Sequence, residues 1–328
     1  MKLYRVSDIP VEEVVSSVYD VGFFASGYEE RCTHVARLVP PTAVNNPIIL
    51  GFSELFNERQ RLENDLFFDK RWTTNRINIS GNDDQQVLVC LRALVAPSLR
   101  RLRLLVDYSS MSRLWYSAIL NWARYVEGLS EITVDLLYSV GDHRKAKRTP
   151  MGIKDILALP GYEGATGPRA NSVAVFGLGF DSLATLCVLD RLEPDICYSY
   201  YASPAAFDDY PERVRSANQE MIAAHSQRTL ELPLSSVEQT FRYLVELITP
   251  HRGEANIIFV PMGPKPHVLA TLLVAMRFRE VGCLRVSGQR TAPEDVGTTG
   301  AVVATRMEFR SNPTRSEEPI VATSDSHE

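Results

Sequence analysis

The sequence predicts an α/β protein made of two similar units, each a mostly parallel sheet flanked by helices, related by internal duplication. Three observations support this class. Short apolar segments alternate regularly with segments of helical periodicity, which is typical of parallel strands joined by helices. Two sequence patterns recur at a nearly constant spacing, as expected for an internal repeat. The length of 328 residues and the hydrophobic content of 45% are sufficient for about two domains.

The first repeated pattern is an apolar strand that turns into a helix at a glycine. The turn is Gly27-Tyr28-Glu29 in the first half and Gly179-Phe180-Asp181 in the second, at an offset of 152 residues. The second pattern follows a later apolar strand, at Asp107–Arg113 and again at Pro261–His267, with an offset of 154. Two copies packed face to face would enclose a pseudo-symmetric cleft, suited to a ligand with its own approximate two-fold axis.

Taken in order, the first half begins with an N-terminal arm (residues 1–20) that carries a short helix near 11–18. Apolar, β-branched runs predict its strands, and helical periodicity predicts its helices. The strands are expected at 21–26, 47–52, 76–80, 102–107 and 131–139, and the helices at 29–38, 56–70, 83–95 and 112–127. The helix at 83–95 follows Asn82-Asp83-Asp84, whose side chains are suited to cap its free N–H groups.

The second half repeats this order. Strands are expected at 172–177, 196–201, 229–233, 256–261, 283–287 and 300–309, and helices at 181–192, 210–225, 236–250 and 266–280. The Pro- and Gly-rich segment between the halves predicts a linker with one short helical turn at 153–158, and the Ser-, Thr-, Pro- and Glu-rich end is typical of disorder. The expected domains are 1–148 (first unit with the arm), 149–170 (linker), 171–310 (second unit) and 311–328 (disordered tail).

Charge and cysteine usage indicate a cytoplasmic protein and argue against several function classes. The net charge of −5 and the pI near 5.8 provide no global basic field, so binding to duplex nucleic acid is not expected. The five cysteines are odd in number and lack CxxC spacing, as in a reducing compartment. No segment is apolar for long enough to span a membrane, and no metal-ligand spacing occurs. We expect neither a metal nor a cofactor.

The turns after the first strand of each half are candidate ligand-binding elements. Ligands of parallel α/β sheets bind beyond the carboxyl ends of the strands, where loops lead into helix N-termini. The segment Gly177-Leu178-Gly179 permits a close approach of the backbone to a ligand. Glu29 and Asp181 have two interpretations: they cap the following helices, or they accept hydrogen bonds from a ligand.

The turns of the second pattern bring cations and hydroxyls to the same edge. Gly263-Pro264-Lys265-Pro266 presents an ammonium group, followed by the titratable ring of His267. The corresponding first-half turn offers Ser109, Ser110, Ser112 and Arg113. Helix capping is an alternative role for Ser110 and Ser112. Capping does not explain Lys265 and Arg113, because a cation at a helix N-terminus opposes the helix dipole. The basic run 143–148 is either a solvated loop or a rim that attracts phosphates.

The apolar strand, the Gly-Pro-Lys-Pro turn and the apolar helix resemble the strand-four signature of CARF domains, the CRISPR-associated Rossmann-like nucleotide sensors. Gly263 and Lys265 match the usual Gly-Gly-Thr-Lys type of turn, whereas Pro264 departs from it and leaves fewer backbone donors. The segment 109–113 matches only loosely. Two such units in one chain are similar to the SAVED arrangement of bacterial antiphage signalling, which implies two Rossmann-like units and recognition of cyclic oligonucleotides. The resemblance covers residues 20–140 and 172–310.

In this family the strand-one turns also face the ligand, so the resemblance implies contacts from Gly27, Tyr28, Gly179 and Phe180. The first functional hypothesis is therefore a sensor that holds a nucleotide second messenger in the central cleft and acts through a protein partner or by homo-oligomerisation. Phosphates would contact the turn cations and serine hydroxyls, and bases would stack on Tyr28, Phe180 or Tyr201, the last at the end of a strand.

Two other hypotheses remain open from the sequence. The protein is an enzyme that acts on a nucleotide or a phosphorylated metabolite, with Glu29 or Asp181 as general acid/base and Lys265 offsetting phosphate charge. As a ring nuclease it would use Ser109, Ser110 or Lys265 to orient a ribose 2′-hydroxyl for attack. Alternatively, it is a duplicated scaffold without a ligand, working as a protein-binding module in a larger complex.

Overall fold

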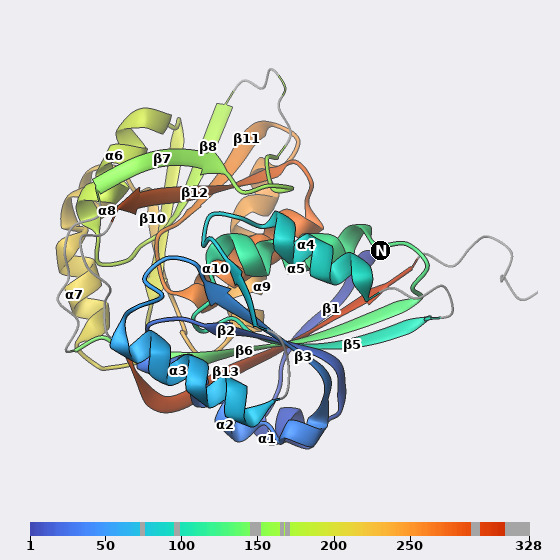
Figure 1. The fold of residues 1–328 in the computed structure, drawn as a ribbon. Helices are drawn as coiled ribbons and strands as arrows, with labels where there is room; N and C mark the ends of the chain where they lie inside the picture. Colours follow the sequence, from blue (N-terminus) through green and yellow to red (C-terminus); the bar gives the residue numbers. More distant parts are fainter. Residues whose placement is uncertain are drawn as a thin grey trace, which may run out of the picture.

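The computed structural model describes residues 1–72, 76–94, 99–144, 152–164, 167, 171–289 and 296–311. It is an α/β fold with two mixed, largely parallel sheets of seven and six strands, resembling two Rossmann-like units (Figure 1). The predicted fold class is therefore confirmed. The basic run 143–148 beyond Arg144 and the tail 311–328 beyond Ser311 lie outside the described residues.

The first sheet has five parallel strands and two antiparallel ones. The parallel strands lie in the order β4-β3-β2-β5-β6, and β13 and β1 extend the sheet beyond β6. The bounds are β1 (Lys2–Asp8), β2 (Tyr19–Ser26), β3 (Val44–Phe52), β4 (Arg76–Ile79), β5 (Arg101–Asp107), β6 (Glu131–Asp142) and β13 (Gly297–Arg310). If the parallel strands are counted in chain order, their order across the sheet is 3-2-1-4-5.

The second sheet repeats this arrangement. Its parallel strands lie in the order β10-β9-β8-β11-β12, again 3-2-1-4-5, and the antiparallel β7 flanks β12 as β13 flanks β6. The bounds are β7 (Gly152–Ala158), β8 (Asn171–Gly177), β9 (Ile196–Ala202), β10 (Arg228–Leu232), β11 (Ala255–Pro261) and β12 (Val281–Gln289). The shared strand order agrees with the predicted duplication.

Helices cover both faces of each sheet, and four of them lie between the sheets (Figure 1). This inner layer contains α4 (Gln85–Ala93), α5 (Arg113–Tyr125), α9 (Val237–Ile248) and α10 (Lys265–Arg277). On the outer faces lie α1 (Val11–Val15), α2 (His34–Leu38) and α3 (Arg59–Arg71) for the first sheet, and α6 (Ser182–Leu192), α7 (Tyr210–Ala217) and α8 (Gln219–Ala224) for the second. Three 3₁₀ turns occur at Glu30–Thr33, Pro41–Ala43 and Thr249–His251.

One apolar core joins the two units. Side chains of α5, such as Trp115 and Ile119, belong to the same buried cluster as Val268 and Leu272 of α10 and the inner faces of both sheets. Separate smaller cores lie under the outer helices. The buried apolar area between the sheets therefore holds the units in a fixed relation, and the ends of their parallel strands meet.

The antiparallel strands β7 and β13 are exchanged between the two units. β7 follows β6 in the chain but pairs with β12 of the second sheet, whereas β13 follows β12 but pairs with β6 of the first. A buried ion pair supports the second exchange, because Arg306 of β13 donates to Asp135 of β6 at 2.7 and 2.9 Å. Each unit thus contributes a strand to the sheet of the other.

This exchange corrects several sequence predictions. The residues 153–158, predicted as a helical turn in a linker, form β7, and the N-terminal arm contains β1, which pairs with β13. The strand predicted at 300–309 is present and longer, but it lies in the first sheet and not with the second-half strands. The sheets therefore do not follow the limits at 148 and 170, whereas the limit at 310 coincides with the end of β13. The single helix predicted at 210–225 is divided at Asn218 into α7 and α8.

Candidate functional site

A pocket of about 540 Å³ lies where the carboxyl ends of the parallel strands of both units meet. It is bordered by the turns after β2 and β5 in the first unit and after β8 and β11 in the second. In each sheet these two strands flank the point where the strand order reverses, which is where open α/β sheets bind ligands. The first unit contributes Glu29, Arg31, Arg113, Tyr138, Val140, Gly141 and His143, and the second contributes Leu178–Leu183, Ala202, Ala205, Ala206, Tyr210, Val214, Leu234 and Met262–Lys265.

Arg113 and Lys265 occupy equivalent positions, since each is the first residue of the helix that follows the fourth parallel strand of its unit. Both line the pocket, as the duplication predicts. Their surroundings differ, because the loop before α5 is longer than the loop before α10 and folds over Lys265. The two cations therefore have different roles in this structure.

Lys265 connects the two units. Its ammonium group donates to the backbone oxygens of Ser109 at 2.6 Å, Met111 at 2.8 Å and Tyr108 at 3.3 Å, all in the loop between β5 and α5. Burial lowers the pKa of Lys265 to about 7, the carboxylates of Glu29 and Asp107 oppose this shift, and the nearby arginines Arg31 and Arg113 add to it. The Lys265 side chain therefore bridges the two units at the pocket wall. Its ammonium group loses its charge as the pH rises through about 7.

Among the described residues that line the pocket, Arg113 is a cation that remains available to a ligand. Its side chain is partly buried and lines the pocket, and within the described part of the chain its guanidinium forms no hydrogen bond and no ion pair. It lies close enough to Lys265 to disfavour the charge there. A guanidinium in this position can donate two hydrogen bonds to a phosphate or carboxylate.

Arg31 and Glu29 form a second, internally paired charge cluster. Arg31 is buried, donates to Glu29 at 2.9 Å, and also donates to the hydroxyl of Tyr138 at 2.9 Å. Ser110 donates to the same carboxylate at 2.9 Å. Burial by itself raises the pKa of Glu29, but Arg31 and Lys265 outweigh it and hold the pKa below its ordinary value. Glu29 is therefore ionised, and its carboxylate already accepts hydrogen bonds from Arg31 and Ser110. These contacts suit a structural role in the pocket wall better than a role in proton transfer.

The serines of the long loop are used within the protein. Ser112 caps α5 by accepting from the backbone N–H of Trp115 at 3.3 Å, as the capping alternative predicts. Ser109 is buried, donates to Asp107 at 2.5 Å, and accepts from the backbone N–H of Ser139 at 2.7 Å. Burial raises the pKa of Asp107 to about 6, against the hydrogen bonds from Ser109. These contacts hold the carbonyl groups that Lys265 binds.

In the second unit, glycines allow two turns to pack together. A Cβ atom at Gly179 would lie 2.5 Å from the carbonyl oxygen of Met262, and one at Gly263 would lie 2.9 Å from that of Leu178. Both glycines line the pocket, but their need for glycine comes from backbone packing between the turns. Asp181 caps α6 by accepting from Ala184 at 3.1 Å.

Ser109, Ser110 and Ser112 lie outside the pocket lining, and so do four further residues expected at the ligand. Tyr201 is buried under the outer helices and donates to Glu231 at 2.7 Å. His267 is buried against Tyr200 in the inter-sheet layer, and burial lowers its pKa to about 4. Gly27 and Tyr28 also lie outside it, with the ring of Tyr28 at 6.1 Å from that of Phe52. Phe180 does line the pocket and packs edge-on against Tyr210 at 5.4 Å.

Sequence reasoning did not identify a pair of buried asparagines. Asn64 of α3 donates to the carbonyl oxygen of Gly27 at 2.9 Å, and Asn218 donates to that of Gly179 at 2.8 Å. The two glycines are 152 residues apart and the two asparagines 154, so the same contact holds the first turn in both units. The matching spacing was visible in the sequence, but a polar residue in a charged helical segment gives no sign that it will be buried.

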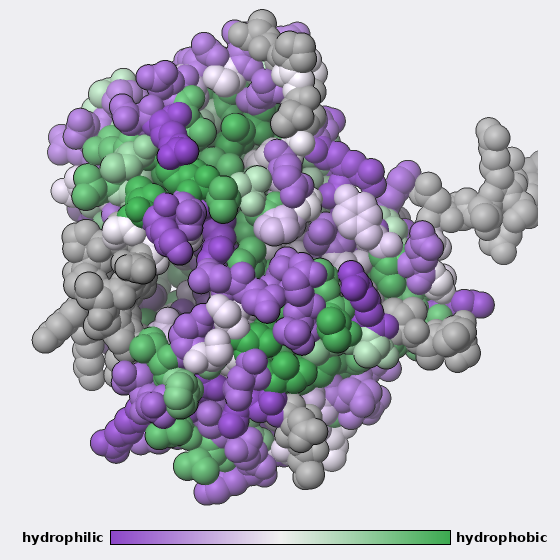
Figure 2. Space-filling model, turned by 45° about the horizontal axis from the view of Figure 1, so that its top comes forward, coloured by the Kyte–Doolittle hydropathy of each residue, from purple (hydrophilic) through white to green (hydrophobic). Residues whose placement is uncertain are grey.

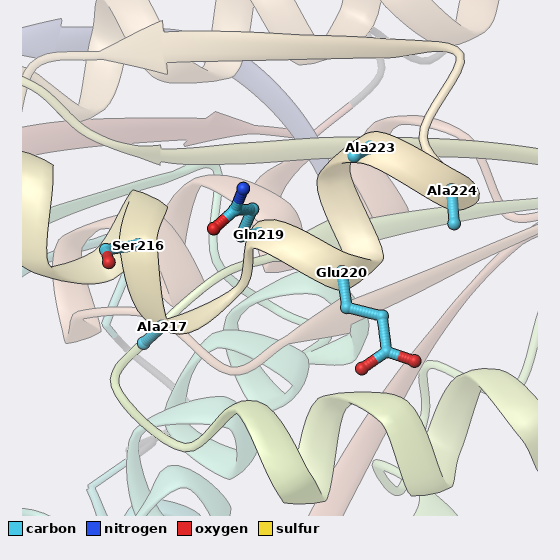
Figure 3. A pocket seen from close by; sticks show the side chains of 6 residues that line it. All are labelled: Ser216, Ala217, Gln219, Glu220, Ala223 and Ala224. Atoms are coloured by element: carbon cyan, nitrogen blue, oxygen red, sulfur yellow. The ribbon is translucent and has the colours of Figure 1, made fainter.

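Other features of the described residues offer less chemistry. A hollow beside α7 and α8 is lined by Ser216, Ala217, Gln219, Glu220, Ala223 and Ala224, with one charged side chain (Figure 3). Among all the described residues, no group of three or more His, Cys, Asp or Glu side chains is arranged to hold a metal ion. No helix formed by the described residues is long and apolar enough to cross a membrane. Hydrophilic and apolar side chains are interspersed over the face seen in Figure 2.

No protein-family model matches this chain, and no curated protein matches its sequence. The functional conclusion therefore depends on the site itself.

Proposed function

We propose that this protein binds a nucleotide second messenger in the pocket between its two units and transmits binding to a protein partner or through self-assembly. The observation that carries the proposal is the pocket at both sheet switch points, which Arg113 lines with a guanidinium that has no hydrogen-bond or ion-pair partner among the described residues. The resemblance to CARF and SAVED proteins implies a cyclic oligonucleotide and a role in antiphage defence. The common strand order of the two units supports the same interpretation.

The pocket favours binding over catalysis. The pKa of Glu29 is held below its ordinary value by Arg31 and Lys265, and Asp181 serves as a helix cap. A general acid or base needs a pKa near the working pH and access to the reacting group. Lys265 has a pKa of about 7, but its ammonium group is bonded to three backbone oxygens. A sensor needs only a shaped wall and a cation such as Arg113 that can reach the ligand.

The proposal is tested by a thermal-shift screen of linear and cyclic nucleotides. A specific ligand should stabilise the protein by about 2.7 kcal/mol at a concentration one hundred times its dissociation constant. Chromatography of the recovered ligand should show it unchanged. Steady consumption of the nucleotide would instead identify an enzyme, and the absence of stabilisation by any nucleotide would leave the scaffold hypothesis.

Binding of an anion is expected to be coupled to the protonation of Lys265. Its pKa is about 7 in the unliganded protein, and an anion nearby favours the charged form and raises that pKa. Above pH 7 binding should therefore take up a proton, and affinity should fall as the pH rises, by at most tenfold per unit. Below pH 7 the lysine is already protonated and this dependence should disappear.

Calorimetry at pH 8 in two buffers of different ionisation enthalpy measures the proton uptake directly. The matched control is Lys265→Met, which should bind without taking up a proton. Equal heats for the native protein in both buffers would show that Lys265 does not sense the ligand. Asp107, with a pKa of about 6, does not titrate in this range.

A further inference from the structure

The two units contribute different chemistry to the pocket, although their folds are the same. Three charged side chains of the lining, Glu29, Arg31 and Arg113, come from the first unit, and the second adds Asp181 and Lys265. The second unit contributes most of the apolar surface, which includes Leu178, Phe180, Tyr210 and Met262, and the first adds Tyr138 and Val140. A ligand held here therefore meets more apolar surface on the side of the second unit.

The asymmetry is clearest at a pair of equivalent residues. Tyr28 and Phe180 follow the glycine of the same turn, 152 residues apart. Phe180 lines the pocket, whereas Tyr28 is directed to Phe52 and does not. After β2 the pocket is lined instead by Arg31, whose guanidinium lies 5.1 Å from the ring centre of Tyr138 and is paired with Glu29. The turn after β2 therefore presents no described ring to the pocket, whereas the turn after β8 presents Phe180.

The apolar wall of the second unit has the composition of a base-binding surface. Phe180 and Tyr210 pack edge to face at 5.4 Å, and the guanidinium of Arg213 lies 5.5 and 5.4 Å from their ring centres. Ala202, Ala205 and Ala206, at the end of β9 and just beyond it, also line the pocket with small apolar side chains. Any planar base can stack on an aromatic surface of this kind, because every base has a π-face.

We infer that the ligand is recognised asymmetrically: one base lies on the Phe180–Tyr210 wall of the second unit, and an adjacent phosphate is bound by Arg113 of the first. The pocket thus reads a single nucleotide unit, either free or within a larger linear or cyclic oligonucleotide. This inference rests on the proposed function. It replaces the expectation that a two-fold symmetric ligand contacts both units in the same way.

The test compares Phe180→Ala with Tyr28→Ala, the same change at equivalent positions of the two units. The probe is the nucleotide selected by the screen, together with the four ribonucleoside 5′-monophosphates, and the readout is the dissociation constant from calorimetry. Phe180→Ala should weaken binding by about tenfold or more, as expected for the loss of a stacked ring. Tyr28→Ala should leave the affinity within about twofold, and the stoichiometry should be one base per chain. Phe180→Leu, which keeps apolar area without a ring, guards against a folding defect.

The outcomes separate this inference from the proposed function. If a nucleotide binds the native protein but both variants lose affinity equally, or neither does, asymmetric recognition is wrong and the sensor proposal stands. If the monophosphates bind and Phe180→Ala alone weakens them, the single-nucleotide subsite is established. If no nucleotide binds the native protein, both proposals fall together.

Discussion

Replacement of Asp135 by asparagine is expected to destabilise the protein by about 3–5 kcal/mol, the typical effect of breaking a buried ion pair. Asp135 is fully buried in β6 and accepts hydrogen bonds from Arg306 of β13 at 2.7 and 2.9 Å. Tyr19 donates to the same carboxylate at 2.7 Å, and Arg103 lies at 3.4 Å. Removing the negative charge leaves Arg306 with Glu13 as its remaining carboxylate partner and Arg103 with none among the described residues.

The effect matters because β13 is the exchanged strand that joins the C-terminal segment to the first sheet. Urea unfolding, followed by circular dichroism, measures the free energy of unfolding of each variant. The matched control is Glu63→Gln, which breaks the exposed Arg59–Glu63 pair of α3 and should have no measurable effect. In a double-mutant cycle with Arg306→Met, the double variant should be less destabilised than the sum of the single variants. Additive losses would show that the pair does not anchor β13.

The parallel strands and the turns that carry the site could be predicted from the sequence, because both depend on local patterns. Apolar runs and helical periodicity identified the ten parallel strands, and the repeated turns located both ends of the pocket. The strand exchange could not be predicted in this way. Pairing at a sheet edge is formed by backbone groups, so β7 and β13 carry no sequence signal that distinguishes one sheet from the other.

The orientation of single side chains also depended on contacts between distant segments. Tyr201 was expected to stack on a base at the end of a strand, but it lies beneath the outer helices, where Glu231 accepts a hydrogen bond from its hydroxyl. Lys265 was identified as a cation at the strand ends, and its partners proved to be carbonyl groups 154–157 residues away. A sequence pattern identifies the residue that is brought to the pocket, whereas the other unit determines what that residue binds.

Arg113→Gln is expected to weaken nucleotide binding by about 10- to 100-fold, the range for losing hydrogen bonds to a charged group. The same variant should be at least as stable as the native protein without ligand. A positive charge at the first position of α5 opposes the helix dipole and disfavours the charged form of Lys265, and no described residue compensates it. A variant that gains stability but loses ligand affinity indicates a side chain whose role is to bind the ligand and not to stabilise the fold.

The measurement pairs urea unfolding of the unliganded variant with calorimetric titration of the nucleotide. Arg113→Lys serves as the matched control, since it keeps the charge and loses the two-pronged hydrogen bonding, and it should bind with intermediate affinity. Arg285→Gln, near Arg113 but bonded to Asn82 and outside the pocket lining, should bind like the native protein. Unchanged affinity in Arg113→Gln would remove the cation from the site. A loss of stability in the same variant would assign Arg113 a structural role, and the case for a phosphate in this pocket would then fail.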